Sequence, residues 1–367
     1  MLAESRFWAL LRAGLWNCEV DLAAWKNGPD VDWNIVYELA CKQALVGIVF
    51  DGIGHLPAPM CPPQKMVLKW YAEVVRIERA NAAVDQALFS LLSLYEKEGI
   101  VPLLLKGQGI GRLYPCPSHR QPGDIDLFMP DDYERSKTLL EEKGIALVAE
   151  CEKHVEYIFQ GVVVENHKYA ACFYNPCRNR KLQKWASRWM KEEPERWLGG
   201  EQDVCVPPAG FNVVFLLIHM LLHFIPSGIG LRQVCDWALL LRTYHQEIDW
   251  NRLGLEVREL GLEHALQAFG YVAVHYLGLP AACLPGVDVG SCESGEFLVR
   301  DILQGGNFGM VRAEKNVPEG KWERLLHNYK VVRRRCRTLM PCWGDEARWY
   351  PYFRVLNWLN KKGKGLD

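Results

Sequence analysis

Two aspartates at alternate positions stand inside an apolar run, GDIDLFMP at residues 123–130, and this run constrains the fold more than any other part of the chain. On a β-strand, residues two apart share a face and lie roughly 7 Å apart. Asp124 and Asp126 are therefore predicted to present their carboxylates side by side, while Ile125 and Leu127 face a core. Like charges this close repel, and a divalent cation between them removes that cost. Because both ligands are oxygen atoms, the pattern favours Mg²⁺ or Mn²⁺.

A third carboxylate is expected from the strand-like segment VVVENHKYA, residues 162–170. Its Glu165 closes a β-branched run that can pair beside the strand of Asp126, and His167 shares the face of Glu165 by the same alternation. Three carboxylates would complete a site for two metal ions, which activate an attacking oxygen and steady a leaving group. The alternative is a solvent-exposed strand edge that carries ordinary acidic residues.

A glycine-rich turn precedes the aspartates in LLLKGQGIG, residues 103–111. The segment leaves a short apolar strand and enters a short helix, which predicts that the backbone amides from Gly107 to Gly109 face phosphates. Lys106 and Arg120 flank the turn, and both side chains pair well with phosphate oxygens. The alternative for each cation is a simple surface charge.

The spacing of apolar residues divides the chain into three regions. Residues 1–99 have the three- and four-residue spacing of helices, and this spacing returns from residue 211. Between them, short apolar runs predict strands at 100–107, 124–130, 145–150, 154–160 and 162–170, with a helix at 131–144. We therefore predict an α+β fold with a small mixed sheet. The predicted parts are a helical region at 1–99, the α+β core at 100–205 and a helical domain at 206–367.

Composition argues against several classes of protein. The 13 cysteines form no CxxC or paired Cys–His motif, so we expect reduced thiols in a cytoplasmic protein. The net charge of -1 gives no reason to expect DNA binding. The first residues predict an amphipathic helix and not a signal peptide. The most apolar run, residues 211–226, is too short for a membrane-spanning helix, which needs about 20 residues.

The order of these elements resembles the nucleotidyltransferase fold of the DNA polymerase β superfamily. A strand, KG, a helix, R-x-x-GDIDLF, a second helix and a later strand with a carboxylate follow one another in the chain. The chain is more similar to a bacterial family of uncharacterised nucleotidyltransferase-like proteins, through LLLKG, LYP, R-x-x-GDIDL, FNVVFLLIH and LRQVCDWALLL. This likeness covers roughly residues 5–310.

The resemblance implies a metal-dependent nucleotidyltransferase. Such an enzyme moves a nucleoside monophosphate from a nucleoside triphosphate, such as ATP, to an acceptor hydroxyl or phosphate. The resemblance implies Asp124, Asp126 and Glu165 as metal ligands and catalytic residues, with Glu165 also a candidate for drawing off the acceptor's proton. The residues expected at the nucleotide are Lys106, Gly107, Gln108, Arg120 and Gly123. The acceptor is left open between a small molecule, a protein and an RNA.

One departure from the superfamily pattern supports an alternative function. Where the superfamily usually has glycine-serine in the turn, this chain has Gly107-Gln108, and Gly107 precedes Asp124 by seventeen positions. The alternative is a non-catalytic nucleotide- or partner-binding protein that keeps the nucleotidyltransferase fold.

Four polar residues in the second half are predicted to line a substrate cleft that faces Asp124 and Asp126. His219 and His223 are four positions apart and share one helix face. For them the alternatives are a zinc site, which no neighbouring glutamate completes, or histidines in a core. Arg232 and Asp236 have the same spacing on the next helix, and their alternative is an ion pair within that helix. The predicted cleft residues are His167, His219, His223, Arg232 and Asp236.

Two basic stretches remain, at residues 178–191 and 330–337. The first carries Trp185 and Trp189 at helical spacing among six Lys or Arg residues. Such a stretch could hold a polyanion, including RNA. We favour the simpler interpretation for both stretches, an amphipathic helix with solvated charges.

Overall fold

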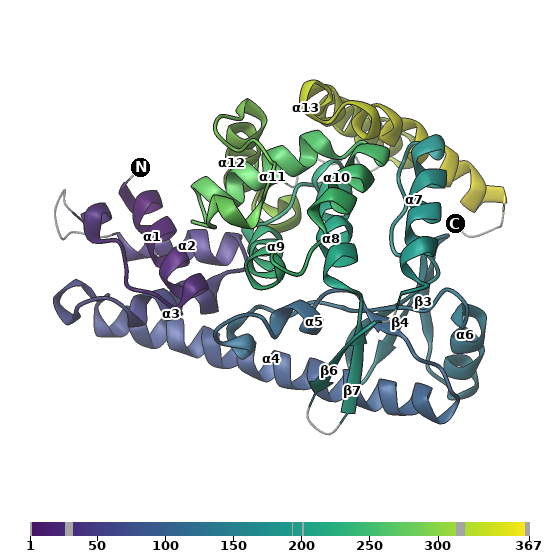
Figure 1. The fold of residues 1–367 in the computed structure, drawn as a ribbon, viewed down its shortest axis with the longest axis horizontal. Coiled ribbons are helices and arrows are strands. Elements are labelled where there is room, and N and C mark those ends of the chain that lie inside the picture. The colour runs from purple at the N-terminus through teal and green to yellow at the C-terminus, as the bar shows by residue number, and fades with distance from the viewer. Residues whose placement is uncertain (1, 26–31, 193, 200–201, 313–319, 364–367) are drawn as a thin grey trace.

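A computed structural model describes residues 2–25, 32–192, 194–199, 202–312 and 320–363. These ranges form an α+β fold in which a mixed five-stranded sheet lies between N-terminal and C-terminal helices (Figure 1). The fold class predicted from the sequence is confirmed. The structure does not test the predicted boundaries at residues 99 and 205.

The N-terminal helices gather at one end of the molecule, over α4 (Figure 1). Asp32 begins α2 by accepting hydrogen bonds from the amides of Asn34 and Ile35, which have no partner within the helix. The apolar spacing of residues 1–99 thus builds the helices that the sequence predicts. Their bounds are α1 Leu2–Trp16, α2 Trp33–Lys42, α3 Val46–Gly54 and α4 Gln64–Lys97.

Helix α4 has 34 residues, which makes it about 50 Å long, and it contacts two separate hydrophobic clusters. Trp70 and Ile77 in its first half are buried among the helices of the N-terminal and C-terminal regions. Leu88 and Tyr95 in its second half are buried against the sheet. The same helix therefore supports both parts of the fold, and it crosses the lower side of Figure 1.

The sheet has the strand order β1-β2-β5-β4-β3. Strand β2 is antiparallel to β1 and parallel to β5, and β4 is antiparallel to both β5 and β3. The parallel pairing sets Asp126 directly beside Glu165. Helix α6, Tyr133–Glu142, connects β2 to β3. The strand bounds are β1 Leu103–Leu104, β2 Ile125–Phe128, β3 Leu147–Glu150, β4 His154–Phe159 and β5 Val162–His167.

A second, two-stranded sheet was not predicted. It consists of β6 Glu195–Gly199 and β7 Gln202–Val206, which are antiparallel, and β7 contacts β1. Before it comes α7, Pro176–Trp189, which contains most of the first basic stretch. Trp185 and Trp189 of α7 are buried and both donate to the Glu256 carboxylate. The two tryptophans therefore belong to the core and do not form an exposed stacking surface.

The C-terminal region is helical, as predicted. Helix α8 is buried along nearly its whole length, which explains the apolar run at residues 211–226. No helix in the described ranges combines the length and the apolar character needed to cross a membrane. The 12 cysteines described are all free thiols, whereas Cys342 has no described side chain. The helix bounds are α8 Ala209–Phe224, α9 Leu231–Tyr244, α10 Trp250–Glu259, α11 Glu263–His275, α12 Glu293–Gly305 and α13 Lys321–Gly363.

Candidate functional site

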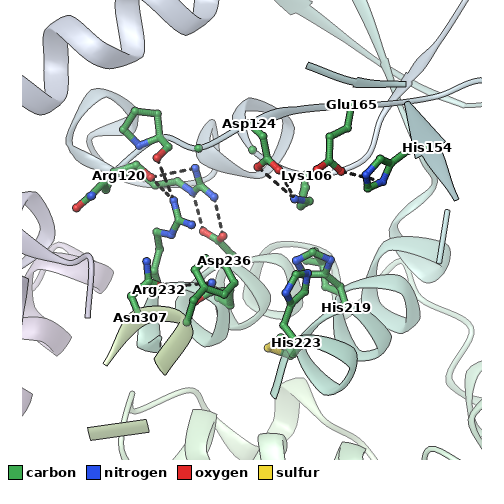
Figure 2. A pocket seen from close by; sticks show the side chains of 18 of the residues that line it. Lys106, Arg120, Asp124, His154, Glu165, His219, His223, Arg232, Asp236 and Asn307 are labelled. Atoms are coloured by element: carbon green, nitrogen blue, oxygen red, sulfur yellow. Dashed lines mark hydrogen bonds and ion pairs between the residues drawn. The ribbon is translucent and has the colours of Figure 1, made fainter. Parts of the chain in front are cut away.

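A cavity of about 330 Å³ lies between the sheet and the helices α8 and α9. Figure 2 shows Lys106, Asp124, Glu165 and His154 along its sheet side. His219, His223, Arg232 and Asp236 come from the opposite helices, and all four line the same cavity. The structure thus brings together residues from both predicted halves of the chain.

Three carboxylates converge on the sheet side of this cavity. Asp126 lies on β2 beside Glu165 of β5, and Asp124 directly precedes β2. One ligand oxygen from each residue lies within 4.8 Å of the others. The Asp126 side chain is 1% exposed, whereas that of Asp124 is 35% exposed. The trio therefore offers one oxygen ligand from inside the protein and others that reach the cavity.

Lys106 lies between the two aspartates. Its Nζ atom is 2.7 Å from Asp126 Oδ2 and 3.3 Å from Asp124 Oδ1. Burial alone would lower the pKa of Lys106, but the carboxylates of Asp126 and Asp124 outweigh it and raise that pKa. Burial likewise opposes ionisation of Asp126, yet Lys106 and His167 keep its pKa below the ordinary value. Asp126 is thus ionised, and the Lys106 ammonium pairs with both aspartates.

The donor set fits a divalent cation. Asp126 Oδ2 is buried, and the Lys106 ammonium lies 2.7 Å from it. The carboxylates thus already gather around one positive charge, and a metal ion bound by the trio would supply further positive charge to the same oxygens. Oxygen donors alone favour Mg²⁺ or Mn²⁺, so Asp124, Asp126 and Glu165 are suited to hold either ion.

Two histidines adjoin the carboxylates. His167 Nε2 lies 3.0 Å from Asp126 Oδ1 and 3.1 Å from Glu165 Oε2, and His154 Nδ1 lies 3.2 Å from the same Glu165 oxygen. Burial would raise the pKa of Glu165, but His167 and His154 lower it to about 2. Burial, with Lys153 nearby, lowers the pKa of His154 to about 4. Glu165 is therefore ionised at neutral pH and His154 is uncharged.

Arg120 lines the cavity and forms a buried ion pair with Asp236. Its guanidinium donates to both carboxylate oxygens of Asp236, with Nε 2.8 Å from Oδ1 and Nη2 2.7 Å from Oδ2. Tyr114 Oη donates to the same carboxylate at 2.7 Å, and all three side chains are buried. Asp236 therefore pairs with Arg120 across the cavity wall and not with Arg232 within α9. The alternative of an ion pair within the helix is wrong.

Arg232 lines the cavity without a carboxylate within 4 Å among the described residues. Its Nη1 donates to the carbonyl oxygens of Gln121, at 2.6 Å, and Pro122, at 3.3 Å. Burial, together with the charge of Arg120, lowers the pKa of Arg232. The guanidinium lies within 4 Å of the place where a Cβ on Gly123 would stand. The Arg232 guanidinium is thus a cation without an ion pair among the described residues, and it lies next to Gly123, which directly precedes Asp124.

His219 and His223 form an aromatic wall of the cavity. Their ring centroids are 4.4 Å apart, and the ring of His223 is 5.3 Å from that of Phe308. Burial, followed by the charges of Lys106 and Lys153, lowers the pKa of His223 to about 4. Burial and the neighbouring His223 lower the pKa of His219 as well. Both rings are therefore neutral at pH 7, and no glutamate joins them into a zinc site among the described residues.

These depressed pKa values predict a stability that falls with acidification. The unfolded chain protonates His223 near its ordinary pKa of 6.5, whereas the folded chain does so only near 4. Stability is thus complete above pH 6.5 and declines as the pH falls toward 4, because the unfolded state binds more protons in this window. Between pH 7 and pH 5, we expect the free energy of unfolding of His223→Gln to fall by on the order of 1 kcal/mol less than that of the wild type.

Urea unfolding at pH 7, 6 and 5 measures this effect. The matched control is His245→Gln, which replaces a partly exposed histidine whose Nδ1 contacts the carbonyl of Arg242. A His223→Gln protein with the same pH dependence as the wild type would contradict the neutral, buried state of the ring.

The glycine turn is held in place by α4. Gly107 has a φ of +62°, a left-handed conformation that suits glycine, and α5 begins at the next residue, with bounds Gln108–Gly111. The Gln108 side chain points away from the cavity and donates to Asp85 at 2.6 Å. Asn81 donates to the carbonyl oxygen of Arg120 at 2.8 Å. Of the residues expected at a nucleotide, only Gln108 thus lacks a place in the cavity lining.

Several cavity residues were not predicted from the sequence. Lys153, His154, Gln233, Asn307 and Phe308 also line the cavity. His154 had a recognisable pattern, because it stands six positions before the turn of Gln160 and Gly161, and His167 stands six positions after that turn. Asp126 and His167 are absent from the cavity surface and lie directly beneath it.

One comparison with known proteins gave a match. A family model described as "Uncharacterised nucleotidyltransferase" matches residues 29–278, which include every predicted site residue from Lys106 to Asp236. No curated protein matches the chain significantly. No solved structure matches it significantly either.

Proposed function

The chain belongs to the uncharacterised nucleotidyltransferase family, and from this we propose that it transfers a nucleoside monophosphate from a nucleoside triphosphate to an acceptor hydroxyl or phosphate. The observation that carries the proposal is the meeting of Asp124, Asp126 and Glu165 beside a cavity with cationic walls. Phosphoryl chemistry needs bound metal ions and cations around the phosphates, and this cavity offers ligands for both.

The three carboxylates would hold one or two Mg²⁺ or Mn²⁺ ions. When bound, such ions activate the attacking oxygen and neutralise charge on the leaving pyrophosphate. Glu165 is a weak candidate for drawing off the acceptor's proton, because a catalytic base works best with a pKa near the operating pH and that of Glu165 is about 2. We therefore assign Glu165 to ligation alone.

Two cations are placed to bind the triphosphate. Lys106 starts the glycine turn and already contacts Asp124 and Asp126, so its ammonium lies where phosphates and carboxylates would meet. Arg232 lies beside Gly123, and no carboxylate of the described residues forms an ion pair with it. We assign the second phosphate contact to Arg232 in place of Arg120, whose guanidinium is engaged by Asp236.

Replacing Arg232 by glutamine should weaken nucleotide binding. A hydrogen bond to a charged group contributes about 1.5–3 kcal/mol, so we expect KM for the nucleoside triphosphate to rise roughly 10- to 100-fold. The control is Arg242→Gln at the exposed end of the same helix α9. An unchanged KM in Arg232→Gln would remove this residue from the nucleotide site.

The function itself is tested with labelled nucleoside triphosphates, Mg²⁺ or Mn²⁺ and a cell extract that supplies acceptors. We expect pyrophosphate release together with labelling of a small molecule, a protein or an RNA. Nucleotide binding without pyrophosphate release, over a broad panel of acceptors, would support the non-catalytic alternative. That alternative is favoured by Gln108 in place of the superfamily's serine.

A further inference from the structure

Three donor atoms converge beside Glu165. They are His154 Nδ1, His167 Nε2 and Glu165 Oε2, and the three residues offer ligand atoms within 4.8 Å of one another. Glu165 Oε2 lies 3.2 Å from His154 Nδ1 and 3.1 Å from His167 Nε2. Donors bound at about 2.0–2.1 Å to one metal ion lie roughly 3.0–3.4 Å from one another in tetrahedral or octahedral geometry. The cluster therefore has the dimensions of a metal site.

The two rings reach this point with different partners. His167 Nδ1 lies 3.4 Å from the carbonyl oxygen of Tyr169, and its Nε2 lies 3.0 Å from Asp126 Oδ1. Without a metal ion, Nε2 carries the hydrogen of that shorter contact, and a bound metal ion would take the place of this hydrogen. A metal-binding histidine commonly donates its other ring hydrogen to a backbone carbonyl, as Nδ1 can here. Among the described residues, His154 Nδ1 is buried without a hydrogen-bond partner, and a metal ion bound here would give it one.

The cluster is closed toward the protein and open toward the cavity. The side chains of His167 and Asp126 are 2% and 1% exposed. His154 and Glu165 are 17% and 16% exposed and line the cavity, so an ion has a path of entry. The sheet fixes this arrangement, because His154 is paired with His167 across β4 and β5, and Glu165 with Asp126 across β5 and β2.

Asp126 divides the region into two sites of different chemistry. Its Oδ1 faces His167, whereas its Oδ2 faces Lys106. On the Lys106 side, the ligands are carboxylate oxygens alone. On the other side, two imidazole nitrogens join the Glu165 carboxylate. Imidazole suits zinc and related transition metals, whereas oxygen-only sets suit magnesium and manganese.

We propose that His154, His167 and Glu165 form a transition-metal site for an imidazole-preferring dication such as Zn²⁺. This site adjoins the magnesium site and shares Glu165 with it. The inference rests on donor atoms and not on the proposed nucleotidyl transfer, so either one can fail without the other.

The test is a Zn²⁺ titration of the full chain, freed of metal by a chelator and kept in excess Mg²⁺ with a non-thiol reductant. We expect the wild type to bind one Zn²⁺ ion at this site, and His154→Gln to weaken that binding by more than about 10-fold, since even outer-shell changes cost 10- to 100-fold. Asp124→Asn removes a ligand of the magnesium site alone and should leave the Zn²⁺ affinity unchanged. His245→Gln, at a partly exposed histidine outside the cavity lining, is the matched control.

X-ray absorption at the zinc edge distinguishes this site from the free cysteines. Nitrogen and oxygen ligands at about 2.0–2.1 Å support the proposal, whereas sulfur at about 2.3 Å places the ion elsewhere. A folded wild type that binds no Zn²⁺, or a His154→Gln protein that binds it as tightly as the wild type, would overturn it. Circular dichroism of each variant shows that the fold is kept.

Discussion

Asp126→Asn should abolish nucleotide transfer and leave the fold intact. The asparagine keeps the shape of the side chain but not the charge, so the buried end of the carboxylate trio no longer attracts a divalent cation. Changes in the outer shell of a metal site already cost 10- to 100-fold, so we expect a loss of more than about 100-fold in kcat/KM for the nucleoside triphosphate. Pyrophosphate release under saturating Mg²⁺ measures it.

The matched control is Asp131→Asn, which replaces an exposed aspartate five positions further along the chain. It should keep full activity. Circular dichroism and the unfolding midpoint of both variants establish that the Asp126→Asn protein is folded. Full activity in that folded protein would refute the assignment of Asp126 as a metal ligand and, with it, the proposed mechanism.

Asp236→Ala should be among the most destabilising single changes in the protein. It leaves the Arg120 guanidinium buried without its carboxylate and deprives Tyr114 Oη of its acceptor. Breaking a buried ion pair from one side costs about 3–5 kcal/mol, because the remaining charge stays out of water. Urea unfolding at pH 7 gives the free energy of unfolding directly.

A double variant distinguishes the contribution of the ion pair from the cost of leaving one of its charges buried alone. Arg120→Met with Asp236→Leu removes both charges and fills the space with apolar atoms, so we expect it to be more stable than Asp236→Ala. The partly exposed pair of Arg76 and Glu73 is the control, where Glu73→Ala should cost less than about 1 kcal/mol. An Asp236→Ala protein that loses no more than this control would show that the buried pair is not required for stability.

Much of the fold could be predicted from local patterns. The five strands of the main sheet, the turn at Gly161 and the helical flanks follow from apolar spacing and from glycine and proline. The hairpin of β6 and β7 could not be predicted in the same way. Its strands have the sequences ERWLG and QDVCV, which show no alternation of apolar and polar residues and cover only five positions each, so they cannot be separated from a loop by pattern.

The parts of the candidate site that lie along one strand or around one turn could be predicted from the sequence. The alternation of β2 gives the Asp124–Asp126 pair, and the equal distances of His154 and His167 from the turn would have given the histidine pair. Contacts between distant segments were beyond such patterns. Helical spacing places Arg232 and Asp236 on one face of α9 but does not show that Arg120, over a hundred positions earlier, takes the carboxylate.

Helix α4 has a consequence for how this catalytic unit can be inherited. Its second half, with Leu88 and Tyr95, covers the sheet, and its Asn81 holds the loop that carries Arg120. A gene segment that began with the first strand would encode a sheet with one apolar face uncovered and a site loop without its anchor. Recombination that transfers the sheet to another protein would therefore have to transfer α4 together with the strands.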